Sequence, residues 1–261
     1  GTRVATGLRA ALLCLLTWLL AGCALMSAGQ NQSEPVATFD LAAVSVTGSQ
    51  GSSGAGEGIQ LIVQEPTALR SLAADRMLIK PQPELISFFP SAVWNDRLPR
   101  LIQARIVQSL QTSPAFDAVS DGRDRLTADL ELAIHLTAFH VVLTGRAGQR
   151  ADGTPAPRRG EARLEMQAKL ISVASGRVIE QRRFAATQPV GQDDANEAAG
   201  ALNEIFAQTL IGIANWLDDA ALAHQSARAA ASIERPSRAA RLRTRRASPP
   251  PAAAPALQAS R

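Results

Sequence analysis

The most regular hydrophobic pattern in this chain is an alternation of apolar and polar positions over residues 126–138. Apolar side chains occupy every second position there: Leu126, Ala128, Leu130, Leu132, Ile134, Leu136 and Ala138. A second alternating run follows the polar segment 145–160: Ala162, Leu164, Met166, Ala168 and Leu170. Residues two apart share one face of a strand, so each run predicts a strand with one buried and one wet face. Ser175 and Gly176 then predict a hairpin turn into a further strand over residues 177–187.

Shorter apolar runs in the first half of the chain predict additional strands. They cover residues 38–41, 59–63, 77–79, 85–89 and 116–119. The run at 59–63 is compact and bounded by Gly58 and Pro66, which indicates a central strand. Pro90 is expected to end the strand at 85–89. The Gly/Ser-rich stretch 48–58 contains too few apolar residues to order itself, and we expect a flexible loop there.

A four-residue apolar period predicts a first helix after residue 95. Asn95 or Asp96 can cap its N-terminus, and Pro99 falls in the first turn, where its missing N–H costs little. Ser113 and Pro114 are expected to stop it. The apolar positions of this helix are Leu98, Ile102, Ile106 and Leu110.

A second, longer helix is predicted from Asp193 and Asp194 to about Leu217. The two aspartates complement the positive end of the helix dipole. Its apolar stripe is Ala198, Leu202, Ile205, Thr209, Ile213 and Trp216. Strands with one buried and one solvent-exposed face, combined with two helices, predict an α+β single domain. Its sheet is expected to be mainly antiparallel, with two helices packed on one face.

The N-terminus carries a different pattern, in which a short apolar run follows two arginines. Arg3 and Arg9 precede residues 10–20, a run too short to span a hydrocarbon core of about 30 Å. The run ends in Leu20-Ala21-Gly22-Cys23, which resembles the lipobox of bacterial lipoproteins. Residues 1–22 are therefore predicted to be a lipoprotein signal peptide, and Cys23 is predicted to be the lipidated N-terminus. The alternative reading makes Cys14 and Cys23 buried cysteines of an apolar helix, but this run lacks the polar face of a core helix.

Lipidation of Cys23 implies a membrane-tethered protein, because two or more acyl chains anchor stably. Residues 23–37 then form the lipidated N-terminus and a flexible tether. Ala24 follows the cysteine at the position where aspartate signals inner-membrane retention in many lipoproteins. We therefore expect the periplasmic face of the outer membrane, with inner-membrane anchoring as the alternative.

Charge is distributed unevenly along the 261 residues. The net charge is +4 and the pI is about 10.0, but eight arginines and a single glutamate lie between Ser226 and Arg261. The body at 38–222 is therefore net negative, and no nucleic-acid partner is predicted from the pI. Residues 223–261 are read as a disordered Arg/Ala/Pro-rich tail. The other reading of this tail is contact with anionic headgroups or an acidic partner.

Candidate catalytic chemistry is sparse. The histidines are His135, His140 and His224, and the first two are expected on opposite faces of one strand as solvated or edge residues. A metal site is therefore not predicted. The chain contains no Gly-x-Ser-x-Gly elbow and no phosphate-loop spacing at 48–58. We predict a protein that is not an enzyme and needs no cofactor. A hydrolase is the weakest alternative, because no nucleophile–base pair is visible.

Several short motifs together resemble one protein family. They are Gln64-Glu65-Pro66 with Leu69, Asp75-Arg76, Phe89-Pro90, Trp94-Asn95-Asp96-Arg97-Leu98-Pro99, the 175–178 hairpin and the terminal helix with Trp216. This pattern resembles the auxiliary lipoproteins of MCE-type ABC transport systems, the PqiC-like proteins, over about residues 38–220. The stretch 94–99 is its most specific part. The loop at 48–58 and the arginine-rich tail depart from the family pattern.

The resemblance implies a non-catalytic role in moving phospholipid or other hydrophobic molecules between inner and outer membrane. The implied partners are an MCE-domain periplasmic protein with its permease and ATPase, and the number of copies, including a homo-oligomer, stays open. The alternative function is an outer-membrane lipoprotein that binds and regulates a cell-wall synthase. Within the motif, Trp94, Asp96, Leu98 and Pro99 are read as structural, through core burial and capping. Arg70 and Arg97 are the candidates for partner binding.

Overall fold

The computed structural model describes residues 35–45, 58–123, 127–144, 148–154 and 156–246, with side chains described up to residue 230. The described residues from Thr38 onwards belong to one compact unit. Cys23, the signal peptide, most of the tether and most of the Gly/Ser-rich loop lie outside the described residues.

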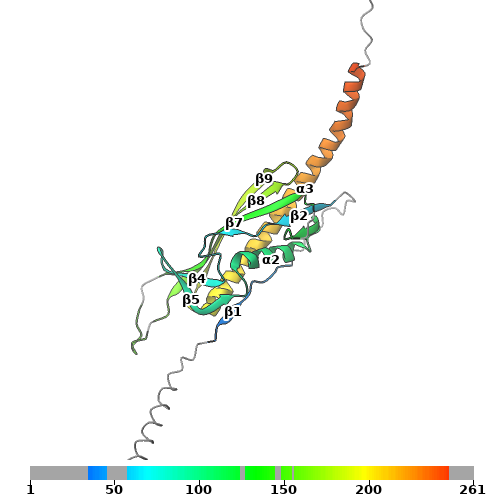
Figure 1. The fold of residues 1–261 in the computed structure, drawn as a ribbon. Coiled ribbons are helices and arrows are strands. Elements are labelled where there is room, and N and C mark those ends of the chain that lie inside the picture. Colours follow the sequence, from blue (N-terminus) through cyan, green and yellow to red (C-terminus); the bar gives the residue numbers. More distant parts are fainter. Residues whose placement is uncertain (1–34, 46–57, 124–126, 145–147, 155, 247–261) are drawn as a thin grey trace, which may run out of the picture. The chain divides into compact units, whose positions relative to one another are not determined.

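Strand β7 (Leu130–Thr144) is the centre of a nine-stranded sheet (Figure 1). On one side it pairs along its whole length with β8 (Arg159–Ser172), which in turn pairs with β9 (Arg177–Val190). Both pairings are antiparallel, as the alternating pattern predicts. The inward positions predicted for β8 are all buried, from Ala162 to Leu170.

The other side of β7 is shared by three short strands in succession. They are β2 (Ile59–Val63), β3 (Thr67–Ala68) and β4 (Arg76–Gln82), and each pairs with β7 in parallel. They follow one another along the chain and along β7, so all three run in the same direction. The sheet is therefore mixed, although its two longest ladders are antiparallel.

Three further strands complete the sheet. Strand β6 (Phe116–Ser120) pairs in parallel with β2, and β5 (Leu85–Trp94) pairs antiparallel with β4. Strand β1 (Ala37–Phe39) lies beyond β5 at that edge. The order β1-β5-β4-β7-β2-β6 thus brings residues from the first half of the chain around the long central strand.

The predicted end of β5 at Pro90 is wrong, because the strand continues to Trp94. Ser91 has a positive φ of 52°, and the register with β4 shifts in this stretch. A β-bulge accommodates a proline that a regular ladder would exclude. Strand β9 likewise runs through Pro189 to Val190, which it can do because it pairs on one side only, with β8.

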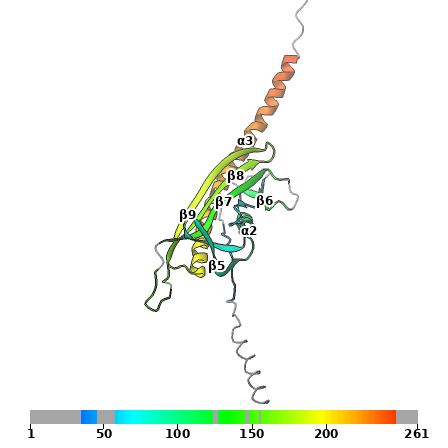
Figure 2. The same ribbon diagram turned by 60° about the vertical axis from the view of Figure 1, so that its left-hand side comes forward.

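Two helices cover the sheet (Figures 1 and 2): α2 (Leu98–Leu110) and α3 (Ala195–Arg246). Their buried side chains belong to the same hydrophobic core as the inward faces of β7 and β8. The predicted stripe of α3 is buried throughout, from Ala198 to Trp216. No helix in the described part of the chain is both long enough and apolar enough to cross a bilayer.

The helix boundaries differ from the predicted ones at two points. The N-cap of α2 is Arg97, and neither Asn95 nor Asp96 caps it. Helix α3 begins as expected, since Asp194 Oδ1 accepts hydrogen bonds from the N–H groups of Asn196 (2.9 Å) and Glu197 (3.1 Å). It then continues well past the predicted end near Leu217, to Arg246.

A bulge at Thr137 changes the faces of β7. The register steps from Leu136 opposite Met166 to Ala138 opposite Glu165, and the Thr137 hydroxyl donates to the Glu165 carbonyl at 3.1 Å. The expectation that His135 and His140 face opposite ways is therefore wrong, since the register places both on one face of β7, opposite Gln167 and Arg163 of β8. Their partners on β8 are four residues apart, which is about 13 Å at 3.3 Å per residue.

Candidate functional site

The segment 94–98 is clamped to the loop between β2 and β4 by backbone hydrogen bonds. The N–H of Trp94 donates to the carbonyl of Asp75 at 2.6 Å, and that of Leu98 donates to the carbonyl of Ala74 at 3.1 Å. Asn95 N–H donates to the carbonyl of Phe39 at 2.7 Å. The motif that is most specific in sequence thus joins β1, the 64–75 loop and the start of α2.

The apolar members of this motif lie in the core. Trp94 is only 3% exposed, and its ring meets Phe139 of β7 edge to face with centroids 5.7 Å apart. Phe139 meets Phe206 of α3 in the same way at 6.4 Å. Leu98 and Pro99 are buried in the first turn of α2. These side chains therefore fix the position of the loop rather than offer a surface to a partner.

Asp96 sits just before the helix rather than at its cap. Its Oδ1 accepts a hydrogen bond from the N–H of Arg97 at 2.7 Å, and its Oδ2 lies 3.3 Å from Nε of Arg100. A carboxylate beside the N-terminus of α2 still favours the helix dipole. Its role is local, through one backbone N–H and one exposed ion pair.

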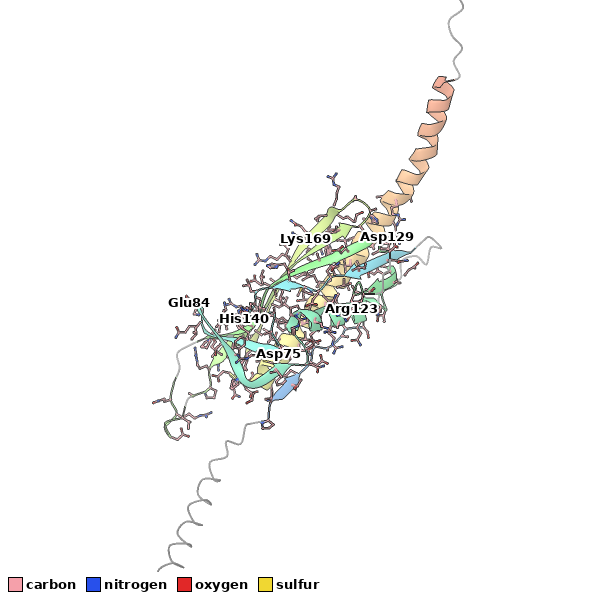
Figure 3. The ribbon with its side chains drawn as sticks, in the orientation of Figure 1. Asp75, Glu84, Arg123, Asp129, His140 and Lys169 are labelled. Carbon is pink, nitrogen blue, oxygen red and sulfur yellow. The ribbon has the colours of Figure 1, made fainter. Side chains whose placement is uncertain are left out.

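The polar members of the motif lie on the surface together with the loop that it clamps. Arg97 is exposed, and its Nη2 lies 3.6 Å from Oε1 of Glu65, which follows β2 in the chain. Leu69 on the same loop is 64% exposed, and Arg70 beside it is exposed as well. We call Glu65, Leu69, Arg70 and Arg97 the loop surface; Figure 3 places Asp75 at the end of this loop.

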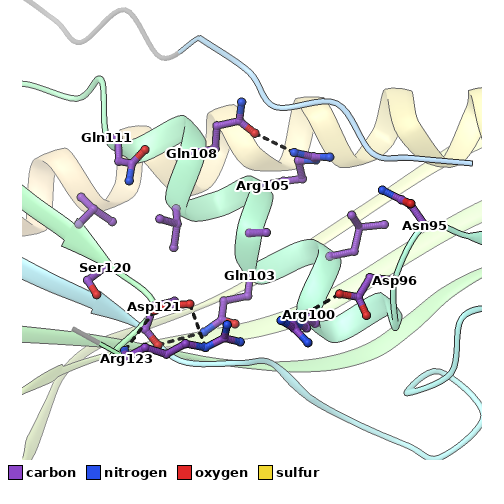
Figure 4. A pocket seen from close by; sticks show the side chains of 14 residues that line it. Asn95, Asp96, Arg100, Gln103, Arg105, Gln108, Gln111, Ser120, Asp121 and Arg123 are labelled. Carbon is purple, nitrogen blue, oxygen red and sulfur yellow. Dashed lines mark hydrogen bonds and ion pairs between the residues drawn. The ribbon is translucent and has the colours of Figure 1, made fainter. Parts of the chain in front are cut away.

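A polar groove of about 680 Å³ runs along α2 (Figure 4). Three arginines of its lining each lie close to a carboxylate: Arg100 with Asp96 at 3.3 Å, Arg105 with Asp40 at 2.6 Å, and Arg123 with Asp121 at 3.2 Å. Its remaining polar lining consists mainly of amides. The groove is largely neutralised by these pairs, and its lining contains no histidine or cysteine to serve as a base or nucleophile.

Gln103 of α2 is a buried polar residue of this groove. Its Nε2 donates to the carbonyl of Val63 at 2.9 Å and, at 3.4 Å, to that of Asp121. Val63 ends β2, and Asp121 follows β6. One side chain thus ties the helix to the ends of two neighbouring parallel strands and holds the groove wall in place (Figure 4).

The segment after β1 is bound between the two helices, which no local sequence signal indicates. Ala42 N–H donates to Oδ1 of Asn203 on α3 at 2.8 Å, and Val44 N–H donates to Oγ of Ser109 on α2 at 2.9 Å. The Arg105 guanidinium hydrogen-bonded to Asp40 lowers the pKa of that carboxyl. The first described part of the body, which follows the expected tether, is therefore attached to both helices.

Two titratable groups are perturbed by burial. His140 is buried on the central strand β7, so the prediction of a solvated or edge-strand histidine is wrong here. Burial together with nearby Lys80 and Arg163 lowers its pKa to about 4. Asp218 of α3 has a raised pKa, chiefly because of burial, although Ser113 Oγ donates to it at 2.8 Å. Over the described ranges, no three His, Cys, Asp or Glu side chains gather as metal ligands would.

Sequence comparison identifies the family to which this chain belongs. A family model described as "ABC-type transport auxiliary lipoprotein component" matches residues 39–214. An uncharacterized protein of Bradyrhizobium diazoefficiens, bll6063, is 24% identical over 203 residues, which are 77% of this chain and 50% of that protein. The chain thus spans about half the length of this curated relative.

Two solved structures share the fold. Protein XCC0632 from Xanthomonas campestris, described with family-model DUF330, superposes with a TM-score of 0.61 at 20% identity, over 73% of this chain and 99% of that one. An uncharacterized protein superposes with a TM-score of 0.50 at 17% identity, over 70% of this chain and 99% of the other. These likenesses establish the fold independently of the sequence motifs.

Proposed function

Because the chain belongs to the family of ABC-type transport auxiliary lipoprotein components, we propose that it is the non-catalytic lipoprotein of an MCE-type ABC transport system. As a member of this family, it is a membrane-anchored lipoprotein of the cell envelope. The proposed cargo is phospholipid or another hydrophobic molecule that moves between inner and outer membrane. The proposed anchor is an acylated Cys23 in the outer membrane, facing the periplasm.

The observation that supports this role best is the division of the 94–99 motif into a buried and an exposed part. Trp94 and Leu98 hold the 64–75 loop against the core, while Arg97 stays on the surface beside Glu65. An arginine next to an exposed leucine is a composition typical of protein interfaces, where Arg pairs with carboxylates and an apolar side chain is desolvated. We therefore assign the docking of the MCE-domain protein to the loop surface, with Arg97 and Arg70 as its cations.

Site-specific photo-crosslinking in cells tests this assignment directly. A photoreactive residue placed at position 70 or 97 of the full lipoprotein is expected to capture the MCE-domain protein, identified by mass spectrometry. The matched control places the photoreactive residue at position 169, where Lys169 is exposed on β8. This control is expected to capture no MCE-domain protein. Capture of a cell-wall synthase at 70 and 97 instead would favour the alternative function and overturn the transport role.

Charge reversal separates docking from folding. Arg97→Glu places a second carboxylate beside Glu65 and is expected to weaken capture of the MCE-domain protein while the thermal unfolding midpoint stays nearly unchanged, since the pair is exposed. Loss of the partner together with a large loss of stability would point to a folding defect.

In cells, deletion of the gene is expected to raise detergent sensitivity. A Cys23→Ser variant is expected to restore resistance poorly because it lacks the acyl anchor.

A further inference from the structure

One residue, Asp129, joins the β8–β9 hairpin to the outer part of α3, through its backbone carbonyl and its carboxylate. Asp129, just before β7, accepts a hydrogen bond from Nη1 of Arg228 at 2.7 Å through its Oδ1. Its backbone carbonyl accepts the N–H of Val173 at 3.0 Å. Figure 3 places Asp129 at this end of the sheet, and Figures 1 and 2 both show the hairpin turn beside α3. Residues of α3 beyond its buried stripe are thus fixed next to the hairpin.

The hairpin presents three exposed aliphatic side chains, which we call the hairpin tip: Val173 (46% exposed), Val178 (51%) and Ile179 (41%). The register between β8 and β9 shifts here, because Ile171 lies opposite Val178 while Leu170 lies opposite Glu180. Ile179 is the extra residue of this bulge. Side chains this exposed contribute little to the core, and a group of exposed apolar side chains marks a surface for interaction.

Beyond Arg228, α3 continues as a strongly basic helix. From Arg228 to Arg246 its sequence contains seven arginines and one glutamate, over a helical length of about 27 Å. We call residues 228–246 the arginine helix. Like charges three and four residues apart repel one another along a helix, and this segment also contains Pro236. A polyanionic surface would offset that repulsion.

We propose that the hairpin tip and the arginine helix together bind the surface of an anionic phospholipid bilayer. Guanidinium groups form bidentate hydrogen bonds with headgroup phosphates, and neighbouring aliphatic side chains enter the boundary of the acyl region. An acidic protein would match the arginines but would leave the three aliphatic side chains unexplained. This second membrane contact is separate from the acyl anchor and does not depend on which transporter the chain serves.

Vesicle flotation of the chain from residue 23, carrying Cys23→Ser so that no acyl chain contributes, tests the proposal. Binding is expected to vesicles that contain phosphatidylglycerol and not to vesicles of phosphatidylcholine alone, and to weaken as salt is raised. A variant with four arginines of the helix replaced by glutamine is expected to bind at least about tenfold more weakly. These four are Arg235, Arg238, Arg241 and Arg243.

The matched control removes the same charge elsewhere and is expected to keep vesicle binding; it replaces Arg100, Arg123, Arg150 and Arg159 with glutamine. Val178→Ser with Ile179→Ser is expected to reduce binding while Arg228 and the helix charges remain. Equal binding by the helix variant and the control would overturn the proposal. So would equal flotation with phosphatidylcholine alone, or capture of an acidic protein by the arginine helix in a chain that binds no anionic vesicle.

Discussion

The ring of Trp94 meets the ring of Phe139 edge to face, with centroids 5.7 Å apart, and through it the family motif contacts the central strand of the sheet. Phe139 in turn meets Phe206 of α3 at 6.4 Å. The three rings connect the loop surface, β7 and the long helix in one continuous packing. The position of the loop therefore depends on the core, even though its polar side chains lie on the surface.

Trp94→Ala is expected to lower the free energy of unfolding by about 3–5 kcal/mol, because it removes a large buried ring and leaves a cavity beside Phe139. Chemical denaturation measured by circular dichroism gives this value. Arg97→Ala serves as the control from the same motif and is expected to stay within about 0.5 kcal/mol of the parent. If the free energy of unfolding fell as little for Trp94→Ala as for Arg97→Ala, Trp94 would contribute little through packing.

Gln103→Met is expected to destabilise the fold by about 1–3 kcal/mol, although it preserves the size of the side chain. Methionine offers no N–H, so the carbonyl of Val63 loses its 2.9 Å hydrogen bond in a buried position. Gln111→Met at the exposed end of the same helix is the comparison and is expected to be nearly neutral. The two urea midpoints measure the difference.

His140 is expected to remain neutral until the pH falls to about 4, well below the ordinary pKa of 6.5. The unfolded chain binds this proton more readily than the folded protein does. The contribution of neutral His140 to stability is therefore complete above about pH 6.5 and is lost as the pH falls towards 4. A two-dimensional NMR titration of the imidazole measures the pKa. His140→Gln is expected to flatten this part of the stability profile; an unchanged slope would contradict the assignment.

Asp218 is expected to make stability depend on pH in the opposite direction from His140. Burial raises its pKa in the folded protein, so folding favours the protonated carboxyl, and stability decreases as the pH rises through that raised pKa. Asp218→Asn keeps an acceptor for the Ser113 hydroxyl and removes the charge. It is therefore expected to raise the thermal midpoint at neutral pH and leave it unchanged at acidic pH. Ser113→Ala removes a hydrogen bond that favours the charged form and is expected to lower the neutral-pH midpoint.

Asn203→Ala is expected to release the segment that follows β1 from α3. The Ala42 N–H then loses its 2.8 Å acceptor, so its amide hydrogen is expected to exchange faster, while the Val44 amide bound to Ser109 is less affected. In Ser109→Ala, the Val44 amide is expected to exchange faster and the Ala42 amide to be less affected. Equal acceleration of both amides in each variant would indicate that the segment opens as one unit.

Local periodicity was sufficient for the elements that bury one face. The alternation from Ala162 to Leu170 predicted the buried face of β8, and the stripe from Ala198 to Trp216 predicted that of α3. Burial of one face selects side chains at the repeat of the element, so the pattern remains readable without any partner. The boundaries of β2 follow from Gly58 and Pro66 for the same local reason.

The errors arose where a distant contact outweighs a local signal. Pro90 should end a strand, yet pairing with β4 and a bulge carry β5 on to Trp94. Strict alternation should separate His135 from His140, yet the extra residue at Thr137 brings both onto one face. A bulge shifts the register by one residue and leaves no mark in composition, so it becomes visible only when both strands are in place.

By itself, the sequence determined the α+β class, the β8–β9 hairpin, the buried stripes and the family motif. Only the tertiary structure decided that β2, β3 and β4 share one edge of β7 in parallel, and that Glu65 meets Arg97. It alone also showed that Asp129 joins the hairpin tip to the arginine helix. The physical reason is the distance in sequence between the residues involved. A repeat of apolar side chains indicates which face of a single element is buried, whereas these contacts join residues tens of positions apart and depend on the packing of the whole domain.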